Sequence, residues 1–125
     1  SKFKPINLVA HLVNKPSSSF FEIENSHELR KLHTNIMEEF EKIASYNVKS
    51  EAFYDKSIRE HSLDWVRNFR KDAAFENYWP HITLLTSNPS KDRKTLKFIA
   101  KRLAICHLGD YNTCRKILVE VTLHS

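Results

Sequence analysis

Residues 80–85 read PHITLL, a short stretch in which polar and apolar side chains alternate. Such alternation is typical of a β-strand with two unlike faces, and a proline can open a strand because its missing N–H is not needed there. On this strand His81 and Thr83 point to one face, while Ile82 and Leu84 point to the other and are expected to anchor it in the core. The stretch therefore predicts an imidazole beside a hydroxyl on an open, concave sheet face.

The flanking sequence predicts a strand hairpin followed by a long helix. Residues 5–13 and 20–24 are rich in β-branched and aromatic side chains, and the turn-forming segment 14–19 lies between them. Ser26 can cap the helix that follows, over about 27–45. Apolar residues recur in this helix at three- and four-residue steps and form one stripe that should pack on the sheet. The stripe consists of Leu29, Leu32, Ile36, Phe40 and Ile43.

The remaining segments complete an α+β domain with a mainly antiparallel sheet, one long helix and one short helix. Residues 46–61 lack periodicity and are expected to form a loop, and a short helix is expected over about 62–70. Residues 102–123 predict two strands joined by a turn at 109–112. The apolar residues that the short helix should bury are Leu63, Val66 and Phe69. We expect residues 1–125 to be a single domain.

Composition excludes several classes of nucleotide-binding protein. Gly109 is the only glycine in 125 residues, so neither a Walker-type phosphate loop nor a dinucleotide-binding fingerprint can form. The formal net charge of +5 gives a mild bias towards anionic partners. No apolar run reaches the length of a membrane span. A basic group follows PHITLL and is expected near it, consisting of Lys91, Arg93, Lys94, Lys97, Lys101 and Arg102.

The His81–Thr83 pair is suited to phosphate chemistry. A histidine titrates near neutral pH and can accept or donate a proton, and a neighbouring hydroxyl can donate a hydrogen bond to a phosphate oxygen. A histidine followed two residues later by threonine is also common by chance, and a half-buried structural histidine is the competing explanation.

Two longer stretches give this pair a wider context. Residues 75–87, FENYWPHITLLTS, and residues 102–123, RLAICHLGDYNTCRKILVEVTL, resemble the two-histidine phosphoesterase superfamily, the relatives of 2'-5' RNA ligase. The resemblance implies a bilobal sheet with two His-x-Thr/Ser motifs facing each other, in which one histidine is general base and the other general acid. It implies RNA or nucleotide substrates with 2',3'-cyclic phosphates or 2'-5' linkages, and no metal or cofactor. His81 and Thr83 match one of the two motifs.

The second motif is missing from the chain. No other histidine is followed two residues later by Thr or Ser, and His11 is followed at that position by Val13. We expect the lobe with the first motif to be absent, either because the chain is a fragment or because it is a single-lobe relative. Three functions are then open: a phosphodiesterase, a non-catalytic module that binds nucleotide or RNA phosphates, and a structural relative without activity.

Several other residues have both a functional and a structural interpretation. Tyr78 and Trp79 could stack on a base or could cover the sheet edge, and Arg115 could pair with a phosphate or face water. Cys106 and Cys114 are expected as ordinary reduced cysteines on facing strands, in preference to a metal site or a disulfide. Reduced thiols and the lack of a leader sequence indicate the cytosol.

Overall fold

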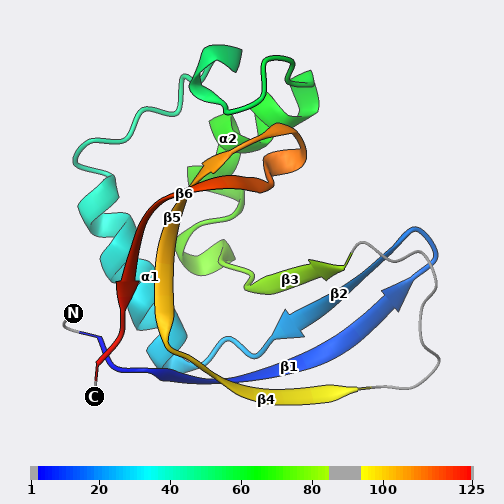
Figure 1. The fold of residues 1–125 in the computed structure, drawn as a ribbon, viewed down its shortest axis with the longest axis vertical. Helices are drawn as coiled ribbons and strands as arrows, with labels where there is room; N and C mark the ends of the chain where they lie inside the picture. Colours follow the sequence, from blue (N-terminus) through cyan, green and yellow to red (C-terminus); the bar gives the residue numbers. More distant parts are fainter. Residues whose placement is uncertain (1–2, 85–93, 125) are drawn as a thin grey trace.

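The structure is a computed structural model that describes residues 3–84 and 94–124, and it has the expected α+β fold. Its larger sheet has four antiparallel strands in the order β3-β2-β1-β4 (Figure 1). Their bounds are β1 Ile6–Lys15, β2 Ser18–Ile23, β3 His81–Leu84 and β4 Thr95–Ala100.

The other elements lie beside this sheet and extend above it in Figure 1. Strands β5 (Arg102–Leu108) and β6 (Cys114–Thr122) pair as an antiparallel hairpin that passes in front of helix α1 (His27–Phe40). Helix α2 (Glu60–Asp72) lies near the tip of this hairpin. Three short 3-10 turns complete the fold, η1 Ser50–Ala52, η2 Phe75–Asn77 and η3 Asp110–Asn112.

The core lies where α1 packs on the middle of the sheet. Ala10 of β1 is fully buried and is paired in register with Ile23 of β2 and with Leu96 of β4. Leu29 of α1 packs against Ala10 and Ile23. The helix begins as expected, because the Ser26 side chain accepts a hydrogen bond of 3.3 Å from the amide of Leu29.

The predicted apolar stripe of α1 is buried only over its first half. Leu29 and Leu32 are buried and Ile36 is half-buried, whereas Phe40 is 38% exposed and Ile43 is 81% exposed. The prediction was wrong for the last turn because α1 ends at Phe40, so that Ile43 lies in a turn beyond the helix. Helix α2 is longer than expected and buries Leu63, with Val66 and Phe69 half-buried.

Strand β4 is the element that the sequence did not predict. Residues 95–100 read TLKFIA and pair antiparallel with β1 from Ile6↔Ala100 to His11↔Thr95. Leu96, Lys97 and Phe98 alternate as in a strand, but Ile99 breaks the alternation, and the flanking lysines and arginines make the segment resemble a solvated basic loop. The short local pattern is therefore masked by its basic flanks, and the pairing with β1 reveals the strand.

The expected burial of the PHITLL strand is also only partly correct. Leu84 is half-buried, but Ile82 is 45% exposed. Among the described residues strand β3 is an edge strand that pairs with β2 alone, and Ile82 is therefore left exposed at this edge.

Cys106 and Cys114 face each other across the hairpin as expected, but they form a disulfide instead of remaining as thiols. In the pairing register Leu108 is opposite Cys114 and Cys106 is opposite Ile117, and the two cysteine Cα atoms are 5.3 Å apart, which is within the range for a disulfide. A reducing compartment was expected because the two cysteines were predicted to be free thiols, and the disulfide contradicts that prediction. None of the helices in residues 3–84 and 94–124 is long and apolar enough to cross a membrane.

We predict that Leu29→Ala lowers the free energy of unfolding by about 2–5 kcal/mol, because it leaves a cavity between α1 and the sheet. The matched control is Ile43→Ala, which removes a mostly exposed side chain and should change stability by less than about 0.5 kcal/mol. Urea unfolding of the two variants measures both values. Equal destabilisation by the two substitutions would contradict this position of the core.

Candidate functional site

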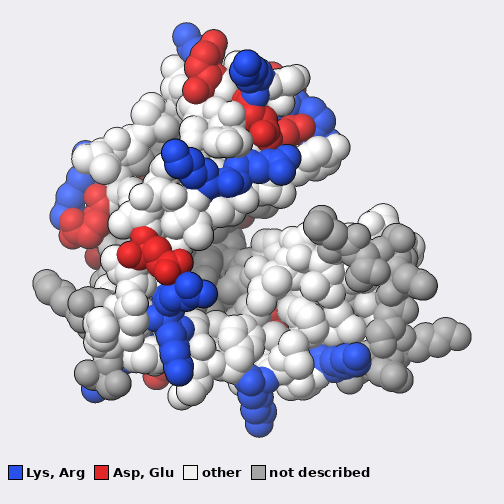
Figure 2. Space-filling model, in the orientation of Figure 1, with Lys and Arg blue, Asp and Glu red and all other residues white. Residues whose placement is uncertain are grey.

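A cavity of about 390 Å³ lies between the edge strand β3, the start of α2 and the hairpin tip at η3. Figure 2 shows the molecule hollowed between the four-stranded sheet and the upper part that contains α2. The volume of the cavity is within the range found for small-molecule binding sites. The lining residues are Arg59, His61, Ser62, Trp65, His81, Thr83, Tyr111 and Asn112.

The structure brings the predicted pair His81 and Thr83 together on one wall of this cavity. Both side chains lie on the same face of β3 and both are exposed. His81 Nδ1 lies 3.0 Å from the carbonyl oxygen of Trp79. A carbonyl can only accept, so Nδ1 carries the proton and, in the neutral ring, Nε2 is the nitrogen left with a lone pair.

The indole of Trp79 fixes the plane of the His81 ring. The two rings are stacked with centroids 4.0 Å apart and an angle of 20° between their planes. Trp79 is itself held by an edge contact with Phe20 and by a hydrogen bond of 3.2 Å from its Nε1 to Glu22 Oε2. Trp79 therefore orients His81, and the ring face that touches the imidazole is not free to stack on a base.

His61 is the residue of this site that the sequence did not predict. It is in the first turn of α2 and lines the same cavity as His81. It lacks the His-x-Thr/Ser spacing, so no local pattern singles it out. The N-terminus of α2 carries the positive end of the helix dipole, which favours an anionic group in the cavity.

The hairpin tip is bound to the start of α2 by a compact set of hydrogen bonds. Asp110 accepts from the amide and Nε of Arg59, at 3.2 and 3.1 Å, and from the hydroxyl of Ser62 at 2.8 Å. The Ser62 hydroxyl oxygen in turn accepts a hydrogen bond of 3.1 Å from the amide of Tyr111. Asp110 thus caps α2 from another part of the chain, since Arg59 at the N-cap provides no side-chain cap of its own.

Hydrogen bonding lowers the pKa of Asp110. Desolvation of the carboxylate, whose side chain is 18% exposed, is the largest single effect and raises the pKa. The hydrogen bonds from Ser62, Arg59 and Tyr111 and the charge of Arg59 together outweigh it, so the pKa of Asp110 lies below its ordinary value. The carboxylate is therefore held in its charged form.

Gly109 allows the tip to approach the neighbouring loop closely. A Cβ atom at this position would collide with the carboxylate of Asp55 and with the side chain of Arg115. Asp55 Oδ2 also accepts a hydrogen bond of 2.7 Å from the amide of Asp110. The single glycine of the chain is thus placed where a side chain does not fit.

Tyr111 and Asn112 form the cavity wall contributed by the tip, and both have left-handed backbone conformations, with φ of 63° and 55°. This region is unfavourable for residues other than glycine, less so for asparagine. The guanidinium of Arg59 lies 3.3 Å from the ring centroid of Tyr111 and holds that side chain in place. Among the described residues, the buried Asn112 Oδ1 finds no hydrogen-bond partner.

Two of the residues expected to bind substrate lie away from this cavity. Tyr78 stacks on His33 at 3.9 Å and packs against the core, and burial raises the pKa of its hydroxyl. Arg115 forms an ion pair with Asp55, at 3.3 Å between Nε and Oδ2. Trp79 contacts the site only through His81.

The described members of the basic group expected beside PHITLL do not line the cavity. Lys97 is on β4, which is separated from β3 by two strands and hence by roughly 14 Å across the sheet. Arg102 pairs with Glu120 on the hairpin. Lys91 and Arg93 lie outside the described residues. Arg59 is the arginine that lines the cavity, and it is already paired with Asp110.

His11 is likewise distant from the cavity. It is in direct register with Glu22, which is in register with His81, so two strand spacings separate the two histidines. Its ring nitrogens contact Glu24 Oε1 at 2.7 Å and Thr95 Oγ1 at 3.2 Å. These contacts give His11 a structural role on the open sheet face.

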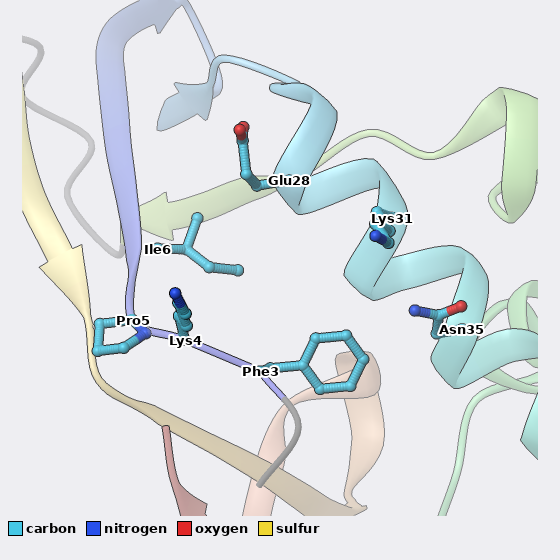
Figure 3. A pocket seen from close by; sticks show the side chains of 7 residues that line it. All are labelled: Phe3, Lys4, Pro5, Ile6, Glu28, Lys31 and Asn35. Carbon is cyan, nitrogen blue, oxygen red and sulfur yellow. The ribbon is translucent and has the colours of Figure 1, made fainter. Parts of the chain in front are cut away.

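A second cavity, of about 350 Å³, lies between the N-terminal segment and α1 (Figure 3). Its walls are formed by residues 3–6 on one side and by Glu28, Lys31 and Asn35 of α1 on the other. These side chains include no hydroxyl or thiol and no histidine, which is the side chain that titrates nearest to neutral pH. The cavity at His81 is therefore the better candidate for a functional site.

No group of three or more metal-ligating side chains gathers in residues 3–84 and 94–124. No protein-family model, curated protein or solved structure matches the chain. The site must therefore be interpreted from its own residues.

We predict that Asp110→Asn loosens the tip from α2 and destabilises the fold at neutral pH. Because the pKa of Asp110 is lowered in the folded state, the ionised carboxylate stabilises the fold above the pKa of an unfolded aspartate, about 3.9, and this contribution is lost as the pH falls through the lowered value. The difference in Tm between wild type and the variant should therefore be constant near neutrality and shrink below about pH 4. A difference that grows as the pH falls would contradict the prediction.

Proposed function

We propose that the chain is a metal-independent phosphoesterase that acts on RNA or nucleotides with a 2',3'-cyclic phosphate or a 2'-5' linkage. The observation that carries the proposal is that two histidines from distant elements, His61 and His81, line one cavity together with Thr83. Opening a cyclic phosphate with water needs a base for the water and an acid for the leaving oxygen, and two histidines in opposite protonation states can perform both tasks near neutral pH.

In this proposal His81 is the general base. Its Nδ1–H is held by the Trp79 carbonyl, so Nε2 accepts a proton from the attacking water. As the new P–O bond forms, the bond from phosphorus to the ribose 2'-oxygen breaks, and His61 donates a proton to that oxygen. The product is a 3'-phosphomonoester with a free 2'-hydroxyl. Thr83 donates a hydrogen bond to a phosphate oxygen from its position beside His81.

We also propose that the fold corresponds to the second lobe of a two-histidine phosphoesterase, with His61 in place of the missing motif. The His-x-Thr pair on an edge strand of an antiparallel sheet supports this, as does the closing hairpin that follows it in the chain. RNA as partner belongs to the same proposal.

We predict that His81→Ala and His61→Ala each lower kcat for 2',3'-cyclic AMP by about a hundred- to ten-thousand-fold, since each removes a proton-transfer group. The rate of the wild-type chain should be bell-shaped in pH and insensitive to EDTA. His124→Ala, an exposed histidine outside the cavity, is the matched control and should leave the rate unchanged. Turnover that survives His81→Ala would contradict the assignment of His81 as the general base. If His81→Ala abolishes turnover and His61→Ala does not, the second proton-transfer group is a residue other than His61.

We predict that Thr83→Val chiefly raises KM, because valine keeps the shape of threonine but cannot donate a hydrogen bond to the phosphate. The loss of one hydrogen bond to a charged group corresponds to about a ten- to hundredfold decrease in kcat/KM. Thr95→Val, on the opposite edge of the sheet, is the control with the same chemical change. Equal effects of the two substitutions would show that Thr83 does not contact the substrate.

A further inference from the structure

The disulfide between Cys106 and Cys114 encloses the segment that forms one wall of the cavity. Cys106 is on β5 and Cys114 is the first residue of β6, and the residues between them include η3 with Tyr111 and Asn112. The bond therefore closes a small loop at whose far end the cavity wall lies. Its position links the redox state of two cysteines to the shape of the site.

The backbone of this loop is irregular. The pairing of β5 with β6 is irregular on both sides of Cys106, with register shifts at Ile105/Cys106 and at His107/Leu108. Tyr111 and Asn112 are held in a backbone region that such residues seldom adopt, and the buried oxygen of Asn112 has no partner among the described residues. An unfavourable local conformation persists only when the surroundings enforce it.

Non-covalent contacts and one covalent bond enforce this conformation. The contacts include the hydrogen bonds that join Asp110 and Tyr111 to Arg59 and Ser62 at the start of α2. They also include the hydrogen bond from the Asp110 amide to Asp55 and the backbone hydrogen bond from Gly109 to Thr113 inside the loop. The covalent bond is the disulfide, which limits how far the two ends of the loop can separate. Without the covalent bond, the hydrogen bonds alone must oppose the conformational freedom of the loop.

The disulfide lies at the surface of the hairpin. Cys114 is exposed and Cys106 is half-buried. Thiol–disulfide exchange requires a thiolate to reach one of the two sulfur atoms, and this exposure permits it.

We propose that the Cys106–Cys114 disulfide is a redox switch for the cavity, in which reduction by a dithiol releases the hairpin tip from α2 and removes the wall formed by Tyr111 and Asn112. A thiolate of the dithiol attacks one sulfur, the Cys106–Cys114 bond breaks, and the second thiol resolves the mixed disulfide. The dithiol becomes a disulfide, and both cysteines become thiols, with two electrons and two protons transferred to the protein. This inference concerns the wall of the cavity and does not depend on which ligand the cavity binds.

The test is amide hydrogen exchange of the whole chain before and after treatment with dithiothreitol. The informative amides are those of Asp110 and Tyr111, which donate to Asp55 and Ser62 at 2.7 and 3.1 Å in the closed tip. Loss of the restraint on a loop of this size should speed their exchange by about ten- to a hundredfold. The amides of β1 provide the internal control and should keep their protection.

The variant with Cys106→Ser and Cys114→Ser should show fast exchange at the tip with and without dithiothreitol. Since the wild-type chain is compared with itself, the test stands even where this variant does not fold. Unchanged exchange of Asp110 and Tyr111 after thiol titration has confirmed complete reduction would overturn the proposal. A loss of protection in β1 equal to that at the tip would also overturn the proposal, because equal losses indicate global unfolding and not local release of the tip.

Discussion

The carboxylate of Asp110 joins the start of α2 to the hairpin tip, the two elements that form two of the three walls of the candidate site. It satisfies an amide at the N-terminus of α2, pairs with Arg59 and accepts from the hydroxyl of Ser62. Through Ser62 it also fixes the amide of Tyr111. Because α2 carries His61 and the tip carries Tyr111, one anionic side chain sets the relative position of two of the three cavity walls.

The third wall, strand β3, was the most predictable part of the site. Alternation in PHITLL is sufficient to place His81 and Thr83 on one face, because side-chain direction in a strand depends only on residue parity. Burial could not be predicted in the same way. Ile82 follows the apolar half of the pattern but lies at a sheet edge, and only the strand order determines which edge is covered.

The remainder of the site depends on contacts between residues distant in sequence. Nothing near His61 distinguishes it from the other histidines, and it lines one cavity with His81 only because the tertiary fold brings the start of α2 to the edge strand β3. The disulfide was missed for a related reason. The cysteines were rightly placed on facing strands, but whether they bond depends on a register that the bulges shift, and sequence spacing does not reveal bulges. Helix α1 was predicted well at its start, where Ser26 provides a local signal, and poorly at its end.

The strand order also has a consequence for how the molecule folds. Strand β1 pairs on one side with β2, its neighbour in the chain, and on the other side with β4, where Ile6 meets Ala100. The first pairing closes a short turn and can form early, whereas the second must wait until a long intervening segment has been drawn together, at a greater loss of chain entropy. Strand β3 adds to β2 on the side away from β4. The strand that carries His81 can therefore take its place in the sheet while the opposite edge is still open.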